Sequence, residues 1–358
     1  MKIEYYPWTE EVLQNTIDVF MKGGLPCIDL EFGAKCNHKI QTSGCIYCDS
    51  YDRVGQNAPN ELTKKQLLNL VDQGIGLGLR WVYVCGLGEP KDDSDLKAVV
   101  KHLSRNKMGI SMFSNGIGYS EEDVTFLHEN KVNLIVKCDS LNPSVFNQLL
   151  GGKKASENGV AESIYKTIGS LIECGYSQHP EEPDLALSIV PTELNLLEIP
   201  RVIEFCKKWS LFPLIGELES AGRASKGYAK LAPSNEQLET LRRDINNILG
   251  YNYDIPLCPA AFAGLHISNT GECLVHEQSG LSCPWFSLLE PRTKILGTIQ
   301  TSTLVELRSS LIKYRECLKE SGELSSFVQK FVKGQHHVFG GCGGLKLMQL
   351  LMSTYMEK

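Results

Sequence analysis

Three cysteines lie close together in the segment CNHKIQTSGCIYC, which runs from Cys36 to Cys48. Eight residues separate Cys36 from Cys45, two separate Cys45 from Cys48, and the aromatic Tyr47 directly precedes the last cysteine. A structural zinc site has four ligands, commonly in two C-x2-C pairs, and no second pair is nearby in the sequence. A [4Fe–4S] cluster held by three thiolates keeps one iron open, so the triplet predicts a catalytic cluster.

The alternative interpretation is a chance grouping of buried free cysteines. Gly44 lies between the thiols and Asp49 and Ser50 directly follow them; these residues are typical of an exposed loop, which favours the cluster. His38 lies in the same loop and could approach a cluster. A loop histidine is more often simply exposed, so we expect exposure for His38.

A glycine-rich segment, GLGEP at residues 86–90, directly follows the run WVYVC. It brings Glu89 to the end of a predicted strand, and Gly86 and Gly88 permit a close approach of the backbone. A GLGE sequence by itself is more often a turn than a site. Its position after a strand, in register with the cysteine loop, favours a functional role.

Five more polar residues lie at the ends of later strands: Ser114, Asn115, Asp139, Ser188 and Glu217. Ligands of parallel sheets bind at the carboxyl ends of the strands, where these residues are expected. The alternatives are ordinary strand-end caps for the serines and the asparagine, and solvated loop carboxylates for the two acids.

Short β-branched or aromatic runs alternate along the chain with longer segments of helical period. Strands are predicted at 27–32, 81–85, 109–114, 132–137, 185–190 and 213–219. Helices are predicted at 61–74, 94–106, 120–131, 160–175 and 195–209. Ser120 and the carboxylates after it are typical of a helix start. Six such units predict an α/β fold, a partial (βα)6 barrel of the TIM type with parallel strands.

The composition indicates a globular, cytoplasmic protein. The chain has 358 residues, 42% hydrophobic and 22% charged, with 13 cysteines and a formal net charge of −6. No apolar run is long enough to span a membrane, and no signal peptide is evident. In a reducing compartment, thiols are metal ligands or small core residues, and core positions are expected for five of them: Cys27, Cys85, Cys138, Cys174 and Cys206.

The strand–helix alternation ends after ESAGRASKG, residues 219–227. A helical linker follows, and then HISNTGECLVHE, residues 266–277, predicts two short strands around a tight turn. We therefore expect a barrel with an N-terminal extension at 1–225, a helical linker at 226–250, and at 251–358 a small domain with a β-hairpin and a helix.

The cysteine loop, GLGEP, the SNG of residues 114–116 and the DS of residues 139–140 together resemble the radical S-adenosylmethionine (SAM) superfamily. The resemblance covers about residues 25 to 225, and the motifs are specific when they are taken together. The usual loop of the family is C-x3-C-x2-C, whereas the first interval is eight here, as in some members. The resemblance implies that SAM is cleaved reductively to a 5′-deoxyadenosyl radical, which abstracts a hydrogen atom from a substrate C–H bond.

The family's roles carry over by motif. Cys36, Cys45 and Cys48 would bind the [4Fe–4S] cluster, and Tyr47 would pack near the adenine of SAM. Gly86, Gly88 and Glu89 would meet the ammonium of its methionine part. Five other residues are implied as contacts to SAM or the substrate: Ser114, Asn115, Asp139, Ser188 and Glu217. A flavodoxin or ferredoxin is the implied electron donor.

The C-terminal region resembles the extension of SPASM and twitch radical SAM enzymes, which holds auxiliary iron–sulfur clusters. Its features are CPAAFAGLHISNTGECLVHE, CPWF, LGTIQTSTLVELRSS, YREC and GGCGG. The seven-cysteine SPASM pattern is incomplete, so the resemblance implies one auxiliary [4Fe–4S] cluster. Its expected ligands are Cys258, Cys283, Cys317 and Cys342, with Cys273 or His276 as a substitute. A zinc site with the same ligands is the alternative.

The substrate is left open between two leading classes, a peptide and a natural-product small molecule such as a sugar or aminocyclitol alcohol. Oxidation is favoured because an auxiliary cluster can accept the second electron. No leader-peptide-binding domain is expected in the 26 residues before the first strand, which lowers the case for a peptide. RNA modification is disfavoured by the acidic charge balance. A non-catalytic iron–sulfur protein would not need the SAM motifs.

Overall fold

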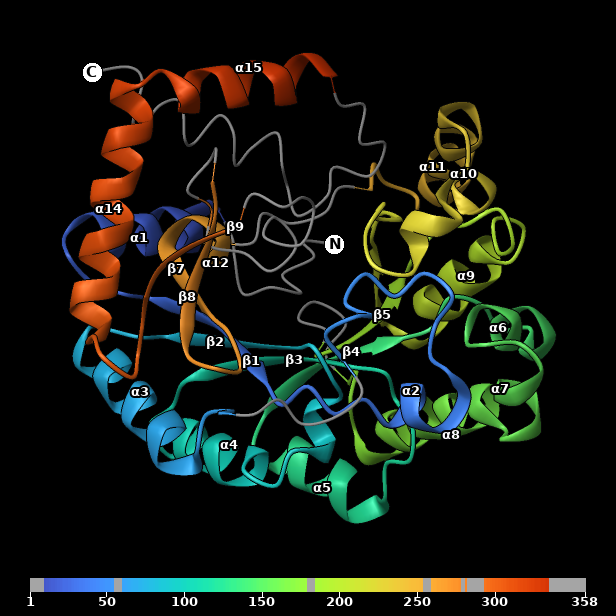
Figure 1. The fold of residues 1–358 in the computed structure, drawn as a ribbon. Helices are drawn as coiled ribbons and strands as arrows, with labels where there is room; N and C mark the ends of the chain where they lie inside the picture. The colour runs from blue at the N-terminus through green and yellow to red at the C-terminus, as the bar shows by residue number, and fades with distance from the viewer. Residues whose placement is uncertain are drawn as a thin grey trace.

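The computed structural model describes residues 10–54, 60–178, 184–253, 259–277, 281 and 293–334. A single curved sheet of nine strands runs through the molecule in the order β6-β5-β4-β3-β2-β1-β7-β8-β9 (Figure 1). The strands are β1 Cys27–Phe32, β2 Trp81–Gly86, β3 Gly109–Ser114, β4 Val132–Lys137, β5 Leu185–Ile189, β6 Phe212–Ile215, β7 Gly264–Ile267, β8 Glu272–His276 and β9 Thr293–Thr298. β1 to β6 pair in parallel in chain order, which confirms the predicted partial barrel.

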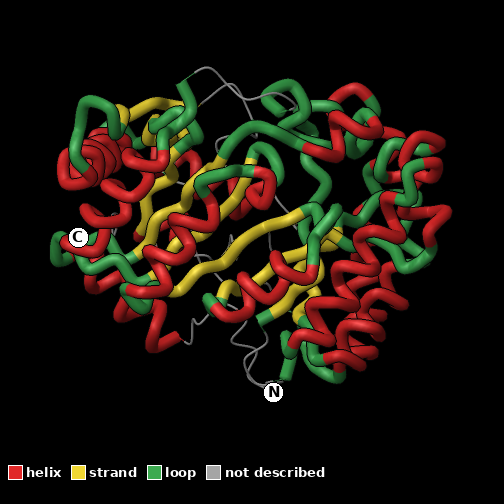
Figure 2. The backbone as a smooth tube through the Cα atoms, turned by 90° about the horizontal axis from the view of Figure 1, so that it is seen from below, coloured by secondary structure: helices red, strands yellow, loops and turns green. Residues whose placement is uncertain are grey.

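Helices lie outside the barrel strands, and Figure 2 shows the strands running between them. The barrel helices are α3 Lys64–Gly76, α4 Leu96–Arg105, α5 Glu121–Glu129, α6 Pro143–Leu149, α7 Lys153–Glu157, α8 Val160–Cys174 and α9 Ile199–Trp209. The others are α1 Glu10–Met21, α2 Asn37–Thr42, α10 Tyr228–Leu231, α11 Asn235–Leu249, α12 Pro259–Ala263, α14 Leu304–Glu320 and α15 Glu323–Gly334, with the short 3-10 turns η1 Pro90–Asp92 and η2 Ala224–Lys226.

Strand β1 is buried on both faces, as expected for a strand inside a helix-covered parallel sheet. On one face Ile28 and Leu30 join the large apolar core under the helices. The other face points into the barrel, where a smaller apolar cluster joins residues of β1 and β2 with residues of β4, β5 and β6: Cys27, Tyr83, Ile135, Ala186 and Phe212. Asp29 and Glu31 alternate with Cys27 on this inner face and are nevertheless 5% and 3% exposed.

The predicted elements agree closely with the observed ones. Five of the six barrel strands match within one residue, and Ser120 caps α5 in a capping box with Asp123. The sixth strand ends at Ile215, although we expected it to continue to 219. Strand β9 was not predicted, because its outward residues from Thr293 to Ile295 are exposed and give no alternating pattern.

The C-terminal strands extend the barrel sheet. β7 pairs in parallel with the free edge of β1, with His266 opposite Asp29, and β8 returns antiparallel to it. Gly271 has a φ of 88° in the turn between them, a backbone conformation that favours glycine. The predicted division of the chain at 226–250 stays a prediction; within the described residues, one sheet runs through both sides of it.

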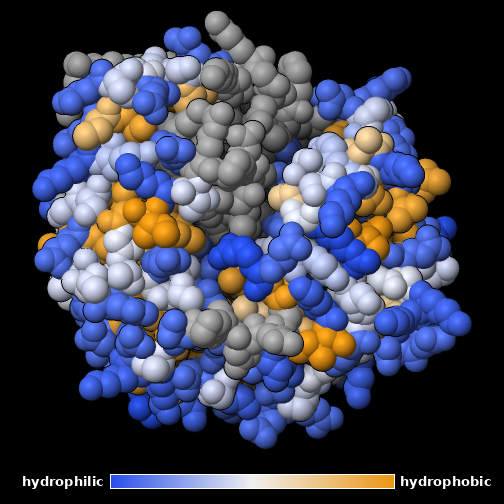
Figure 3. All heavy atoms as spheres, in the orientation of Figure 1, coloured by the Kyte–Doolittle hydropathy of each residue, from blue (hydrophilic) through white to orange (hydrophobic). Residues whose placement is uncertain are grey.

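The surface of the view in Figure 3 is mostly hydrophilic, with apolar side chains in scattered groups. Leu197 is the most exposed of the large apolar side chains described, at 91%. Among the described helices, none is long and apolar enough to cross a membrane.

Candidate active site at the carboxyl ends of the strands

The long interval between Cys36 and Cys45 is folded as a short helix. α2 occupies residues 37–42, and Cys36 is its N-cap, with its sulfur accepting a hydrogen bond from the amide of Lys39 at 3.4 Å. Ser43 and Gly44 then turn the chain back with φ values of 89° and 75°. The eight-residue spacing therefore returns Cys45 to the neighbourhood of Cys36 without a loose loop.

The three thiols are partly buried and interact electrostatically. Burial, together with the charge of Cys45, raises the pKa of Cys36 to about 11. Burial likewise raises the pKa of Cys48, with Cys45 and Cys36 among the contributing charges. Burial also acts to raise the pKa of Cys45, but Lys137 and His38 outweigh it and lower that pKa.

The three loop thiols do not all lie as close together as the ligands of one metal ion would. Sulfur ligands of a tetrahedral zinc lie about 3.8 Å apart, given a Zn–S bond of about 2.3 Å. Among the described residues, Cys36, Cys45 and Cys48 do not form a group whose sulfur atoms all lie within 4.8 Å of one another. In a [4Fe–4S] cluster, each thiolate binds a different iron, so wider separations are needed.

The expectation that His38 is exposed is wrong. Its side chain is 1% exposed, since α2 turns it inward. Nε2 lies 2.7 Å from the carbonyl of Leu150, and Nδ1 lies 3.5 Å from the sulfur of Cys45. The imidazole therefore connects the cysteine loop with the end of α6, and it lies directly against a predicted cluster ligand.

A cation and an acid from the end of β4 meet the aromatic residue of the cysteine loop. Lys137 lies 2.8 Å from Asp139 and 4.2 Å from the ring centre of Tyr47. The hydroxyl of Tyr47 donates to Asp139, which is completely buried and also accepts from the amide of Val190 at 2.8 Å. The solvated alternative for Asp139 is therefore wrong. Lys137 was missed, although a lysine ending the apolar strand VNLIVK is a usable signal.

The predicted SAM-binding residues after β2 and β3 are joined by hydrogen bonds. Glu89 is 2% exposed, and its carboxylate accepts from the hydroxyl of Ser114 at 2.9 Å and from the amide of Asn115 at 2.7 Å. Tyr119, which was missed, donates to the same carboxylate at 3.1 Å. Burial raises the pKa of Glu89 to about 7, although these hydrogen bonds oppose it.

The same group is tied to the cysteine loop. The side-chain amide of Asn115 donates to Asn37 of α2 at 2.8 Å, and the amide of Glu89 donates to the carbonyl of Lys35 at 2.8 Å. A Cβ at Gly88 would lie 2.1 Å from that carbonyl oxygen. Only glycine fits there, because the two loops are in backbone contact.

A segment after β6 closes over the cysteine loop. The guanidinium of Arg223 donates to the carbonyls of Ser43, Gly44 and Cys45 at 2.8, 3.0 and 3.4 Å. Its own amide donates to the carbonyl of Cys48 at 2.9 Å. The sequence GRAS was taken only as the end of the barrel pattern, so the role of Arg223 was missed; it depends on contacts between residues about 180 positions apart in the chain.

Two further predicted site residues lie on or after the last two barrel strands. Ser188 is on β5, in register with Lys137 on β4, and is partly buried. Glu217 follows β6 and is also partly buried. The structure therefore leaves their assignment as a prediction.

Most of the expected auxiliary ligands lie outside the described residues: Cys258, Cys283 and Cys342. Cys317 is exposed on α14. Cys273 is buried in the apolar core, where burial raises its pKa to about 12. His276 ends β8, and its side chain is not described.

Five other cysteines were expected in the core. Cys27, Cys138 and Cys206 are completely buried, as predicted. Cys174 and Cys85 are only partly buried. The thiol of Cys85 donates to the carboxylate of Asp29, so a purely apolar role for Cys85 is wrong.

Part of the chain matches a known protein family. Residues 30–176 match the model of the radical SAM superfamily. The chain contains a radical SAM domain. This domain holds the cysteine loop and the strand ends after β2, β3 and β4, and members of the superfamily use a [4Fe–4S] cluster and SAM.

Two kinds of curated protein are similar to the chain. The sporulation killing factor maturation protein SkfB of Bacillus subtilis (strain 168) is 26% identical over 236 residues, covering 64% of this chain and 52% of that protein. The GTP 3′,8-cyclase of Synechocystis sp. is 24% identical over 195 residues, covering 54% of this chain and 56% of that protein. The matches thus span about half the length of these relatives.

Solved structures confirm the fold of the radical SAM domain and its C-terminal strands. Streptococcus suis SuiB bound to S-adenosylmethionine gives a TM-score of 0.59 at 15% identity, covering 83% of this chain and 70% of that one. The protein anSMEcpe, with bound AdoMet and a peptide named Kp18Cys, gives 0.56 at 14% identity, covering 80% and 82%. At these identities the similarity is one of fold.

Proposed function

We propose that this chain is a radical SAM enzyme that carries out an oxidative modification of a peptide. The observation that carries the proposal is the hydrogen-bonded contact between the cysteine loop and the Glu89 group, through Asn37, Asn115 and Lys35. A cluster held by Cys36, Cys45 and Cys48 and a SAM ammonium met by Glu89 would then share one rigid frame. When bound, the two cofactors supply a 5′-deoxyadenosyl radical that abstracts a hydrogen atom from the substrate.

The residues of the chain position these cofactors. Glu89 offers a buried carboxylate, oriented by Ser114 and Tyr119, and an ammonium beside it would gain a charge-assisted hydrogen bond. Lys137 and His38 favour the thiolate of Cys45 over the thiol, which a metal ligand requires. Tyr47, next to Cys48 in the loop, is held in place by its hydrogen bond to Asp139. Gly86 and Gly88 allow the backbones to approach closely.

The test is the production of 5′-deoxyadenosine by the anaerobically reconstituted protein with a reductant. Replacing all of Cys36, Cys45 and Cys48 by Ala should abolish this product while the circular dichroism spectrum is retained. Cys206→Ala is the matched control, since it also removes a buried thiol but lies on α9. Unchanged 5′-deoxyadenosine formation by the triple variant would overturn the assignment of the cluster.

An auxiliary [4Fe–4S] cluster on Cys258, Cys283, Cys317 and Cys342 is part of the proposal. The exposed position of Cys317 on α14 is compatible with a ligand shared with a neighbouring segment, whereas Cys273 is enclosed by the core. At about four irons per cluster, the wild type should hold close to eight irons and the Cys36/Cys45/Cys48 triple variant close to four. Adding Cys342→Ala should remove these. Zinc in their place would make the region a structural lid.

A peptide substrate is supported by the names of relatives. SkfB is a killing-factor maturation protein, and one of the solved structures of similar fold is SuiB bound to its precursor peptide SuiA. A small molecule is the second candidate, favoured by the similarity to GTP 3′,8-cyclases. Mass spectrometry after incubation with a peptide encoded beside the gene, an aminocyclitol alcohol or GTP separates these classes. A flavodoxin or ferredoxin is the proposed electron donor.

A further inference from the structure

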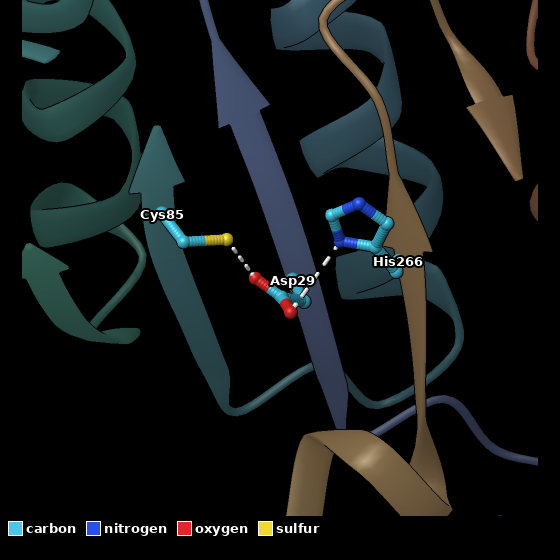
Figure 4. Close-up of side chains that lie close together, drawn as sticks. All are labelled: Asp29, Cys85 and His266. Carbon is cyan, nitrogen blue, oxygen red and sulfur yellow. Dashed lines mark hydrogen bonds and ion pairs between the residues drawn. The ribbon is translucent and has the colours of Figure 1, made fainter. Parts of the chain in front are cut away.

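A second group of ligand-type side chains lies inside the barrel, away from the cysteine loop. Asp29 of β1, Cys85 of β2 and His266 of β7 come from three adjacent strands and point toward one another on the inner face (Figure 4). One oxygen, nitrogen or sulfur atom from each lies within 4.8 Å of the others, and Asp29 and His266 are 5% and 0% exposed. We propose that this group binds a divalent cation of the zinc class.

The ligand atoms suit such an ion. Imidazole nitrogen, thiolate sulfur and carboxylate oxygen are the three donors that zinc takes in proteins. Nδ1 of His266 lies 3.4 Å from Oδ2 of Asp29. This is longer than the 2.7–2.9 Å of a charge-assisted hydrogen bond. It agrees with the separation of about 3.3 Å between nitrogen and oxygen ligands of a tetrahedral zinc, whose bonds are about 2.0 Å.

A second carboxylate lies behind the histidine. Nε2 of His266 faces Oε1 of Glu31 at 3.5 Å, while Nδ1 faces the site. Glu31 is itself held by Arg53 at 3.3 Å and by the amide of Asn269 at 3.4 Å. A carboxylate on the second ring nitrogen fixes the orientation of a metal-binding histidine and raises its basicity. At 3.5 Å, Glu31 is the carboxylate that would serve as the outer-shell partner of His266 when the ion is bound.

The exchange of protons for the metal balances in charge. The thiol of Cys85 donates a hydrogen bond to Asp29, and the ion would replace the thiol proton and the proton on Nδ1 of His266. A dication enters and two protons leave, so the net charge of this buried group is unchanged. No electron is transferred in this step.

Three protein ligands leave one tetrahedral position for another donor, as in catalytic rather than structural zinc sites. Cys85 directly precedes Gly86, the first residue of the proposed SAM segment. A hydroxyl, thiol or carboxylate of the substrate would be the donor that completes the site. Metal binding itself does not depend on the proposed function, and it is tested in a protein without the radical cluster.

Cobalt(II) is the probe, because tetrahedral cobalt–thiolate sites show a charge-transfer band in the near ultraviolet. It is added to the Cys36/Cys45/Cys48 triple-alanine variant and to the same protein with Cys85→Ala. Cobalt on cysteines elsewhere contributes equally to both and cancels in the difference spectrum. The band should be present in the difference, and Cys206→Ala in place of Cys85→Ala should leave no difference.

Two further variants test the roles of Cys85 as a ligand and of Glu31 as an outer-shell partner. Cys85→Ser retains a hydroxyl that can donate to Asp29, and it should lose the band while the circular dichroism spectrum is unchanged. Glu31→Gln should keep the band but weaken cobalt binding roughly 10- to 100-fold, the usual loss when an outer-shell partner of a ligating histidine is changed. A folded Cys85→Ser protein with the full band, or absence of the band in the parent, would overturn the site and leave the proposed radical chemistry untouched.

Discussion

The cysteine loop and the C-terminal strands both depend on β1, but they are held by different forces. The loop follows the carboxyl end of β1, and side chains from three other parts of the chain contact it: Asn115 after β3, Lys137 at the end of β4 and Arg223 after β6. The C-terminal strands lie along the edge of β1 and are fixed by backbone pairing through β7. Side chains thus decide the geometry of the first region, and the backbone decides that of the second.

Because the two regions are held in different ways, we expect mutations in them to have different effects. Single side-chain changes in the first region should disturb the radical site while the sheet persists. In the second region, similar changes should alter the stability of the whole sheet, because backbone pairing continues from β6 to β9.

Arg223→Ala should have the largest effect. It removes hydrogen bonds to the carbonyls of Ser43, Gly44 and Cys45. Bonds from a charged group at this half-buried site are worth about 1 to 1.5 kcal/mol each, so about 3 to 4.5 kcal/mol of loop stabilisation should be lost. The iron of the radical cluster should then be removed by a chelator more than a hundredfold faster than from the wild type.

Arg201→Ala is the control for Arg223, since it removes an exposed arginine of α9 that pairs only within its own helix, with Glu198. Arg223→Lys should retain only part of the loop stabilisation, because one ammonium reaches fewer carbonyls than a guanidinium. Equal iron retention in Arg223→Ala and the wild type would mean that the loop is held by its own turn and α2 alone.

Glu89→Gln should weaken SAM binding more than cluster assembly. The loss of a charge-assisted hydrogen bond to the ammonium should cost about 1.5 to 3 kcal/mol, or roughly ten- to a hundredfold in affinity. Equilibrium binding of SAM to the reconstituted protein measures this, with the iron content of the same sample as the reference. If the dissociation constant were unchanged, Glu89 would serve only to join β2 with β3.

Replacing two helix-capping residues should have the smallest effects, and these effects test whether the chain unfolds as one unit or as two. Ser120 caps α5 in the barrel, and Thr303 caps α14 in the C-terminal region, each through a capping box. Replacing either by Ala should lower the free energy of unfolding by about 1 kcal/mol. Because the sheet is continuous, both changes should shift the same single denaturation transition of the cluster-free triple variant. Two transitions, with Thr303→Ala moving only one, would favour the division at 226–250.

Periodicity and local spacing were enough to predict the barrel. Short runs rich in β-branched and aromatic residues, bounded by turn residues, predicted β1, β3 and β4 to the residue, because such side chains favour buried strands. Cys36, Cys45, Cys48 and Glu89 were recognised because their chemistry depends on residue type and on distance along the chain. β9 was missed because an exposed edge strand does not need that pattern.

The groups around these residues were decided by tertiary structure alone. His38 was expected in solvent and is buried against Cys45, and Arg223 reaches a loop about 180 residues earlier in the chain. Asp29, Cys85 and His266 meet only because β7 pairs with β1 after the barrel has formed. Such contacts leave no local signal, since a sequence records which side chain follows which, and strand pairing determines which distant side chains share one face.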